Sequence, residues 1–135
     1  MEHRQPALAA DCVVFDPQER LLLIRRKNPP FQGQYALPGG FVEYGETTEQ
    51  AAARELAEET GLRATALLLV GVYSEPGRDP RQHIVSIAYL VRVADYAPRA
   101  GDDASEAEFV ADWERERLAF DHDKIVADAL ALRAK

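Results

Sequence analysis

Short apolar runs alternate along the chain with short polar segments rich in proline, glycine and aspartate. Apolar runs of this length that contain β-branched residues are typical of buried strands, and the segments between them are typical of turns. The pattern predicts strands at residues 8–16, 21–24, 35–37, 64–73, 83–93 and 107–111. Since only a turn-like segment at 16–19 separates the first two, we expect a hairpin there. We expect Pro38 and the two glycines after it to end the third strand.

Two segments carry the signals of helices. Thr47 and Gln50 have the spacing of a capping box, which predicts a helix that begins near Thr48. Gly61 is placed to end this helix in a left-handed conformation. Residues 121–135 space their apolar side chains as an amphipathic helix does, so a closing helix is expected there.

This order of elements indicates a fold class. Several strands with one early and one late helix predict an α/β fold in which a mixed sheet lies between helices. The 135 residues fit one domain spanning 1–135, because a chain of this length rarely builds two independent cores.

The charge composition limits which classes of binding partner the protein can have. Lys and Arg number 16 and Asp and Glu number 23, which gives a formal net charge of −7. Such a surface repels a nucleic-acid backbone, so we expect no nucleic-acid partner. Surplus carboxylates suit divalent metal ions, which prefer oxygen ligands.

One cysteine, Cys12, lies in an apolar run, and we expect a buried structural thiol. A chain without a possible intrachain disulfide suits a reducing compartment, and the sequence offers no signal-peptide core and no bilayer-spanning run. These features predict a cytoplasmic protein with no membrane partner.

The expected early helix carries three glutamates on one face, Glu55, Glu58 and Glu59. Like charges at this spacing destabilise a helix, and a bound divalent cation would offset the repulsion. A solvated helix face, with Arg54 paired to Glu58, is the alternative interpretation.

The residues around these glutamates resemble the Nudix box, G-x5-E-x7-R-E-U-x-E-E-x-G-U, in which U is aliphatic. Every defined position is filled, by Gly40, Glu46, Arg54, Glu55, Leu56, Glu58, Glu59, Gly61 and Leu62. Residues 37–41 also resemble the strand and turn that precede the helix in that family. The resemblance covers essentially the whole chain and implies the Nudix-type α/β/α sandwich.

The resemblance implies a metal site. Glu55, Glu58 and Glu59 would bind Mg²⁺, or Mn²⁺ in its place, and the Gly39 carbonyl would add a ligand. Since Mg²⁺ takes one or two carboxylates and keeps several waters, this set of ligands indicates two or more ions. Arg54 would orient the carboxylates.

The remaining box positions and the catalytic base are also implied by the resemblance. Gly40, Glu46 and Gly61 would shape the box. The base toward water is either Glu55 or a carboxylate of the late acidic loop, and the choice stays open. In that loop Glu106 is the first candidate, followed by Asp103 and Asp102.

The implied reaction is hydrolysis of a nucleoside diphosphate linked to another moiety. Residues 73–81 resemble a loop of ADP-ribose pyrophosphatase-like members, and Pro76 stands fifteen positions after the box glycine Gly61, as in those members. Arg78 and Arg81 would contact the diphosphate or the terminal ribose. The alternative is a surface loop in which Asp79 pairs with an arginine.

Aromatic and histidine side chains complete the candidates. Phe31 and Tyr35 are placed to stack on an adenine, although packing explains them equally well. His83 and His122 are expected to be structural more often than ligand-binding. Trp113 and Phe120 are expected in the core.

The leading prediction is hydrolysis of ADP-ribose, a small-molecule nucleotide, to AMP and ribose 5-phosphate. A house-cleaning nucleoside triphosphate pyrophosphohydrolase is the alternative enzyme, and a non-hydrolysing ligand-sensing domain is a third hypothesis. The complete box argues against the third. The sequence is compatible with either a monomer or a homodimer.

Overall fold

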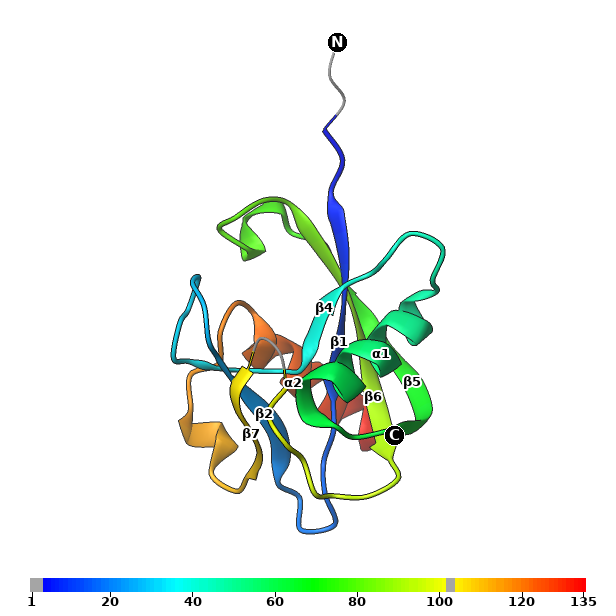
Figure 1. The fold of residues 1–135 in the computed structure, drawn as a ribbon, viewed down its shortest axis with the longest axis vertical. Coiled ribbons are helices and arrows are strands. Elements are labelled where there is room, and N and C mark those ends of the chain that lie inside the picture. The colour runs from blue at the N-terminus through cyan, green and yellow to red at the C-terminus, as the bar shows by residue number, and fades with distance from the viewer. Residues whose placement is uncertain (1–3, 102–103) are drawn as a thin grey trace.

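The computed structural model describes residues 4–101 and 104–135 and contains two sheets (Figure 1). The larger sheet has four strands in the order β4-β1-β6-β5. Its strands are β1 Ala7–Val13, β4 Gly39–Phe41, β5 Ala64–Tyr73 and β6 Ile84–Val93. Because β1 and β6 are parallel and the other pairs are antiparallel, the sheet is mixed, as predicted.

The smaller sheet has three antiparallel strands in the order β3-β2-β7. These strands are β2 Leu21–Arg26, β3 Tyr35–Ala36 and β7 Ala104–Val110. The expected hairpin between the first two strands forms only around its turn, since β1 and β2 belong to different sheets. There Phe15 and Leu21 form an antiparallel bridge, the Asp16 N–H donates to the Arg20 carbonyl, and the Leu22 N–H donates to the Val14 carbonyl. Beyond these residues each strand pairs with other strands.

The two predicted helices are present as α1 Thr48–Thr60 and α2 His122–Arg133. In α1, the Thr47 side chain accepts from the backbone N–H of Gln50, and the Gln50 side chain accepts from the Thr47 N–H, so the capping box is confirmed. Gly61 ends α1 with φ 73°, also as predicted. Two short 3₁₀ turns that the pattern did not indicate, η1 Pro76–Arg78 and η2 Trp113–Arg115, lie in the loops.

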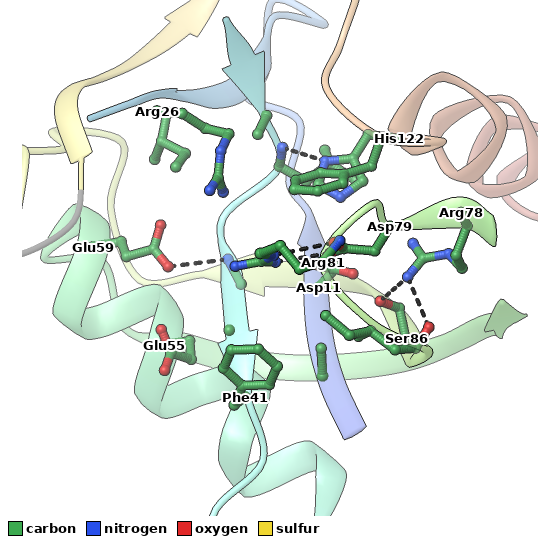
Figure 2. A pocket seen from close by; sticks show the side chains of 18 of the residues that line it. Asp11, Arg26, Phe41, Glu55, Glu59, Arg78, Asp79, Arg81, Ser86 and His122 are labelled. Atoms are coloured by element: carbon green, nitrogen blue, oxygen red, sulfur yellow. Dashed lines mark hydrogen bonds and ion pairs between the residues drawn. The ribbon is translucent and has the colours of Figure 1, made fainter. Parts of the chain in front are cut away.

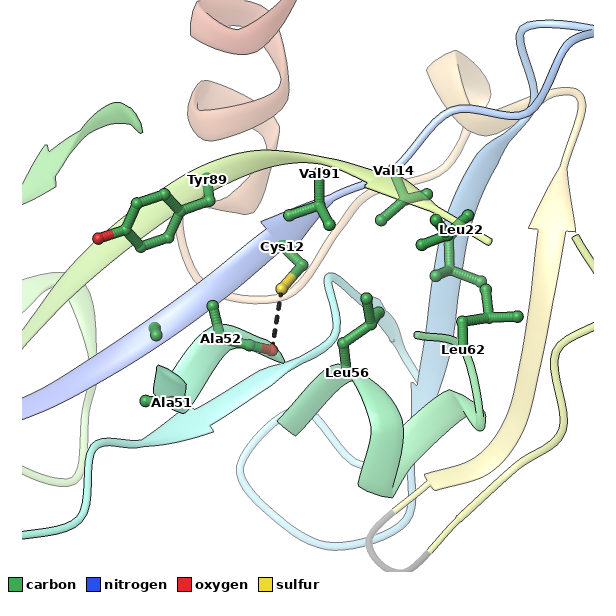
Figure 3. Packing of buried hydrophobic residues seen from close by; sticks show 11 residues of the cluster. Cys12, Val14, Leu22, Ala51, Ala52, Leu56, Leu62, Tyr89 and Val91 are labelled. Carbon is green, nitrogen blue, oxygen red and sulfur yellow. Dashed lines mark hydrogen bonds between the residues drawn. The ribbon is translucent and has the colours of Figure 1, made fainter. Parts of the chain in front are cut away.

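The helices cover opposite faces of the four-stranded sheet. Apolar side chains alternate between the faces of β1, since Cys12 packs with Leu56 of α1 (Figure 3) whereas Val13 packs with Ile125 of α2. The Cys12 thiol is fully buried, as expected, and lies 3.4 Å from the Ala52 carbonyl oxygen. The α/β fold with a sheet between helices is confirmed.

A further difference concerns the residues after Pro38. The two glycines were expected only to break a strand, but Gly39–Phe41 forms β4 and pairs with Ala9, Ala10 and Asp11 of β1. Glycine serves this strand because backbones and carboxylates approach it closely. None of the helices in the described part of the chain is long and apolar enough to cross a membrane.

Candidate active site

A pocket of about 290 Å³ is lined by residues from both sheets, α1, the η1 loop and the start of α2 (Figure 2). Acidic and basic groups face the same space. The polar and charged lining residues are Asp11, Arg26, Asn28, Glu55, Glu59, Arg78, Asp79, Arg81, Ser86 and His122. A pocket with this lining suits a ligand that carries both anionic and neutral polar groups.

The acidic face of α1 contributes two of its three glutamates to the pocket. Glu55 and Glu59 line it, whereas the Glu58 side chain is 43% exposed and lies outside the lining. Glu59 is only 5% exposed, and its Oε1 accepts from the Gly39 N–H at 3.3 Å. Its other oxygen, Oε2, is buried and has no hydrogen-bond partner within residues 4–101 and 104–135. Burial first, and then the charge of Glu55, raise the pKa of Glu59 to about 9.

Arg54 ties the glutamates to the segment before the helix. Its Nη2 and Nε donate to the two oxygens of Glu46 at 2.6 and 3.1 Å. Its Nη1 lies 2.8 Å from Glu55 Oε1 and 3.2 Å from Glu58 Oε2. The planar guanidinium therefore sets where the Glu55 carboxylate points.

Gly39 and Gly40, at the start of the Nudix box, leave room for carboxylates. A Cβ on Gly40 would lie 2.4 Å from Glu55 Cδ, and a Cβ on Gly39 would lie 2.3 Å from Asp11 Oδ1. Real Cβ atoms do not approach other atoms this closely. Any side chain at either position would therefore displace a carboxylate of the pocket.

The oxygen atoms beside α1 fit a hard divalent cation. Among residues 4–101 and 104–135, no three acidic, histidine or cysteine side chains are already gathered as a metal-holding group. Yet Glu59 keeps an unpartnered buried oxygen, and a buried carboxylate without a partner is costly unless a cation offsets it. The donor set of Glu55, Glu59 and the Gly39 carbonyl is oxygen only, as Mg²⁺ and Mn²⁺ prefer.

Beside Gly39, on the neighbouring strand β1, lies a second buried carboxylate of the pocket, Asp11, which is 6% exposed. Its Oδ2 also has no hydrogen-bond partner in the part of the chain that the structure describes. Burial raises the pKa of Asp11, while His122, Ser86 and Arg78 act in the opposite direction.

His122, the first residue of α2, is likewise buried. Its Nδ1 accepts from the backbone N–H of Leu37 at 3.0 Å. Because Nδ1 is an acceptor, the proton of the neutral ring is on Nε2. Burial lowers the pKa of His122, which favours this neutral form.

The two arginines of the η1 loop are both held by carboxylates. Arg78 donates to Asp121 at 2.5 and 2.8 Å and to the Ser86 hydroxyl at 2.8 Å, and its side chain is 4% exposed. It lines the pocket, but these bonds already use its guanidinium nitrogens. Arg81 donates to Asp79 at 2.7 and 3.1 Å, the pairing that the surface-loop alternative anticipated.

Arg81 also faces the pocket, together with aromatic rings. Its guanidinium lies 5.7 Å from the ring centre of Phe41 and 5.6 Å from that of Phe120. Phe120 lines the pocket and also packs, partly buried, against a cluster of core residues. A flat group entering here would meet both aromatic faces and a planar cation.

Several other candidates lie outside the pocket lining. Pro76 is exposed at the start of η1. Phe31 packs edge-on against Phe120 at 4.8 Å, and the Tyr35 hydroxyl donates to Glu108 at 2.5 Å. His83 contacts the Ser74 carbonyl oxygen. In their present contacts these side chains serve packing and loop structure.

The late acidic loop starts against the end of α1, where the Gly101 N–H donates to the Glu59 carbonyl at 2.9 Å. Glu106 points elsewhere, since it is exposed, lies outside the pocket lining and is 3.3 Å from Arg25. Asp102 and Asp103 lie outside the described residues.

Asp11 was missed by the sequence analysis, although a signal for it exists. It stands within an otherwise apolar segment that forms a buried strand. Aspartate is seldom fully buried, and a carboxylate in a core strand needs a functional or electrostatic reason. The interruption of the run was therefore informative.

The family model described as NUDIX domain matches residues 5–129. The chain belongs to the NUDIX family. A protein of Methanocaldococcus jannaschii named ADP-ribose pyrophosphatase is 52% identical over 123 residues, which are 91% of this chain and 72% of that protein. The predicted family is thus confirmed, and the chain is a Nudix hydrolase.

Solved Nudix structures share the fold. The NUDIX domain of Shewanella oneidensis NrtR, solved in complex with ADP ribose, is 30% identical, with a TM-score of 0.89 over 98% of this chain and 91% of that one. A bifunctional NMN adenylyltransferase/ADP ribose pyrophosphatase from Francisella tularensis, solved with AMP and a manganese ion, is 27% identical, with a TM-score of 0.85 over 97% of this chain and 43% of that one. Nudix hydrolases need a divalent metal ion, in agreement with the oxygen donors beside α1.

Proposed function

We propose that this Nudix hydrolase cleaves ADP-ribose to AMP and ribose 5-phosphate. The observation that carries the proposal is the pocket itself, where the box glutamates Glu55 and Glu59 share one space with Arg81 and the rings of Phe41 and Phe120. The name of the M. jannaschii relative and the ADP-ribose complex of the S. oneidensis domain support this substrate.

The residues beside α1 would hold the metal. We infer that Glu59, Glu55 and the Gly39 carbonyl bind Mg²⁺, with Mn²⁺ as a substitute, and that Glu58 joins them when Arg54 releases it. More than one ion suits this number of oxygen donors. Such an ion supplies positive charge against the diphosphate oxygens and the leaving phosphate.

The chain's own groups would do the remaining chemistry. Glu55 accepts a proton from the attacking water, and the bond from Arg54 Nη1 at 2.8 Å orients it for this task. The exposed position of Glu106 and its pairing with Arg25 support Glu55 over Glu106 as the base. Arg81 can turn from Asp79 toward a phosphate oxygen, because its side chain is 41% exposed.

The adenine would lie against the aromatic rings of the pocket. The Arg81 guanidinium lies near the rings of both Phe41 and Phe120. A purine that enters between these groups is held by stacking on the rings and on the guanidinium. Phe31 would act only indirectly, by supporting the Phe120 ring at 4.8 Å. Pro76 would shape the η1 loop, and Arg78 would anchor that loop to Asp121.

A substrate panel tests the proposal. The protein is incubated with Mg²⁺ and, separately, ADP-ribose, 8-oxo-dGTP and canonical nucleoside triphosphates, and the products are separated by chromatography. We expect AMP and ribose 5-phosphate from ADP-ribose at the highest kcat/KM. If a triphosphate releases pyrophosphate with a higher kcat/KM, that triphosphate and not ADP-ribose is the substrate. Tight binding of ADP-ribose without cleavage would indicate a sensing domain.

A further inference from the structure

The buried carboxylate Asp11 lies in the pocket but outside the Nudix box, and no described residue forms a hydrogen bond with its Oδ2. It stands on β1 directly across from Gly39, whose N–H donates to Glu59. Asp11 is therefore one strand away from the proposed metal and diphosphate position. Figure 2 shows it between the glutamates of α1 and the pair Ser86 and Arg78.

A hydrogen-bond donor accompanies this acceptor. The His122 ring keeps its proton on Nε2 because Nδ1 accepts from the Leu37 N–H, and Nε2 has no hydrogen bond to the described residues. His122 and Asp11 are both buried and both line this pocket, so their side chains face the same space. One oxygen of Asp11, Oδ2, and the Nε2 donor of His122 therefore line the same pocket without a hydrogen-bond partner among the described residues.

This pair matches a hydroxyl group better than other parts of a nucleotide. A hydroxyl donates one proton and accepts through its oxygen, whereas an exocyclic amine only donates and a phosphate oxygen only accepts. A phosphate would also be repelled by the carboxylate. In a nucleoside diphosphate derivative the group next to the diphosphate is a sugar, and the base lies farther away.

We propose that Asp11 and His122 bind a sugar hydroxyl next to the diphosphate, with Asp11 accepting its proton and His122 Nε2 donating to its oxygen. The inference rests on the proposed function, since it concerns the same pocket and substrate. Asp11 and His122 would then determine which diphosphates are preferred as substrates. A substrate that lacks the hydroxyl leaves both buried groups without a hydrogen-bond partner, so a substrate that carries it is preferred.

The hydroxyl can come from the adenosine ribose or from the terminal ribose, and three substrates separate these sources. ADP-ribose carries both sugars. The β-methyl ester of ADP lacks the terminal ribose, and 2′,3′-dideoxyadenosine diphosphoribose lacks the hydroxyls of the nucleoside sugar. Each is assayed with Mg²⁺ for kcat/KM, and each is also titrated into the metal-free protein in EDTA to measure Kd.

Two variants remove the pair one member at a time. Asp11→Asn has nearly the same shape as the native side chain but lacks the charged acceptor. His122→Asn keeps an oxygen near the place of Nδ1 for the Leu37 N–H and lacks the Nε2 donor. If Asp11→Asn fails to fold, His122→Asn still tests the proposal. Asp16→Asn is the matched control, because Asp16 is equally buried and does not line the pocket.

We expect each variant to lose about 10- to 100-fold in kcat/KM and in affinity for ADP-ribose, and little for whichever analogue lacks the recognised hydroxyl. Asp16→Asn should leave the ratios between substrates unchanged. Equal losses on all three substrates, or no loss on any, would overturn the proposal, because Asp11 would then serve the metal site or the fold, or bind only a water molecule. A wild-type protein that neither cleaves nor binds ADP-ribose would instead refute the proposed function and this inference with it.

Discussion

The guanidinium of Arg54 makes two hydrogen bonds to the carboxylate of Glu46, from Nη2 at 2.6 Å and from Nε at 3.1 Å. Glu46 precedes α1, and Arg54 lies within it, so this pair of hydrogen bonds holds the segment before the helix against the helix. The remaining nitrogen, Nη1, reaches Glu55 at 2.8 Å. The position of the proposed base thus depends on an arginine that is itself held from outside the helix.

Replacing Arg54 with lysine tests this dependence. A lysine carries the charge but a single nitrogen, which cannot bind Glu46 through two edges and reach Glu55 as well. We expect Arg54→Lys to lower kcat with Mg²⁺ by about 10- to 100-fold while thermal unfolding changes little. Arg20→Lys, at an arginine paired with Asp16 outside the pocket lining, should leave kcat unchanged. An unaltered kcat in Arg54→Lys would show that Glu55 is oriented by other contacts.

Glu59→Gln should separate activity from stability. Glutamine can still accept from the Gly39 N–H, and it removes a buried oxygen that has no partner among the described residues. We therefore expect turnover to fall by about two to three orders of magnitude while the free energy of unfolding without metal stays within about 1 kcal/mol of wild type or rises.

The measurements are kcat at saturating Mg²⁺ and denaturant unfolding in EDTA. Glu49→Gln, at an exposed position in the first turn of the same helix, is the matched control and should keep both values. Near-normal turnover in Glu59→Gln would remove this residue from the metal site.

Gly40→Ala should damage the site through one methyl group. Its Cβ would fall 2.4 Å from Glu55 Cδ, so the carboxylate must move. We expect kcat/KM to drop by about 10-fold or more. In Gly77→Ala the new Cβ has no atom within 4 Å, so activity should persist. Equal kcat/KM for the two variants would mean that Glu55 tolerates displacement.

Stability should depend on pH through Asp16. Burial raises the pKa of this carboxyl, but hydrogen bonds from the Arg20 and Gln18 backbones and the Arg20 side chain outweigh it, and the pKa is lowered below 3.8. A carboxyl with a lower pKa in the folded state stabilises the fold above its unfolded pKa, and this contribution is lost as the pH falls through the folded pKa.

Asp16→Asn should therefore lower the free energy of unfolding by about 1–2 kcal/mol at neutral pH. The difference from wild type should shrink as the pH drops below about 4. Urea unfolding at a series of pH values measures this difference. A difference that stays constant down to pH about 2 would mean that the charge of Asp16 contributes nothing, and only its shape matters.

The acidic helix is the part of the site that local sequence could predict. Its boundaries follow from Thr47, Gln50 and Gly61, since a capping box and a left-handed glycine act within a few residues. The glutamates share a face because the helix period is 3.6 residues. The periodicity alone left Glu58 equal to Glu59, whereas the structure buries only Glu59.

The loop arginines show the opposite case. Arg78 and Arg81 looked alike in the sequence, two cations of one turn-rich segment. The fold separates them, since Arg78 is enclosed by Asp121 and Ser86 while Arg81 stays partly exposed beside the aromatic rings. Asp121 is 43 residues away from Arg78, so no local pattern indicates the pairing.

The sequence by itself determined the family and the boundaries of the acidic helix, because these depend on spacings between residues that lie close together in the chain. It did not determine that the first two strands part into separate sheets, nor that Asp11 of β1 faces Gly39 of β4. The Leu37 N–H that holds His122 lies 85 residues before it. Such contacts arise only when strands pair and helices pack across long sequence separations, where the burial of apolar faces, rather than local propensity, decides which residues meet.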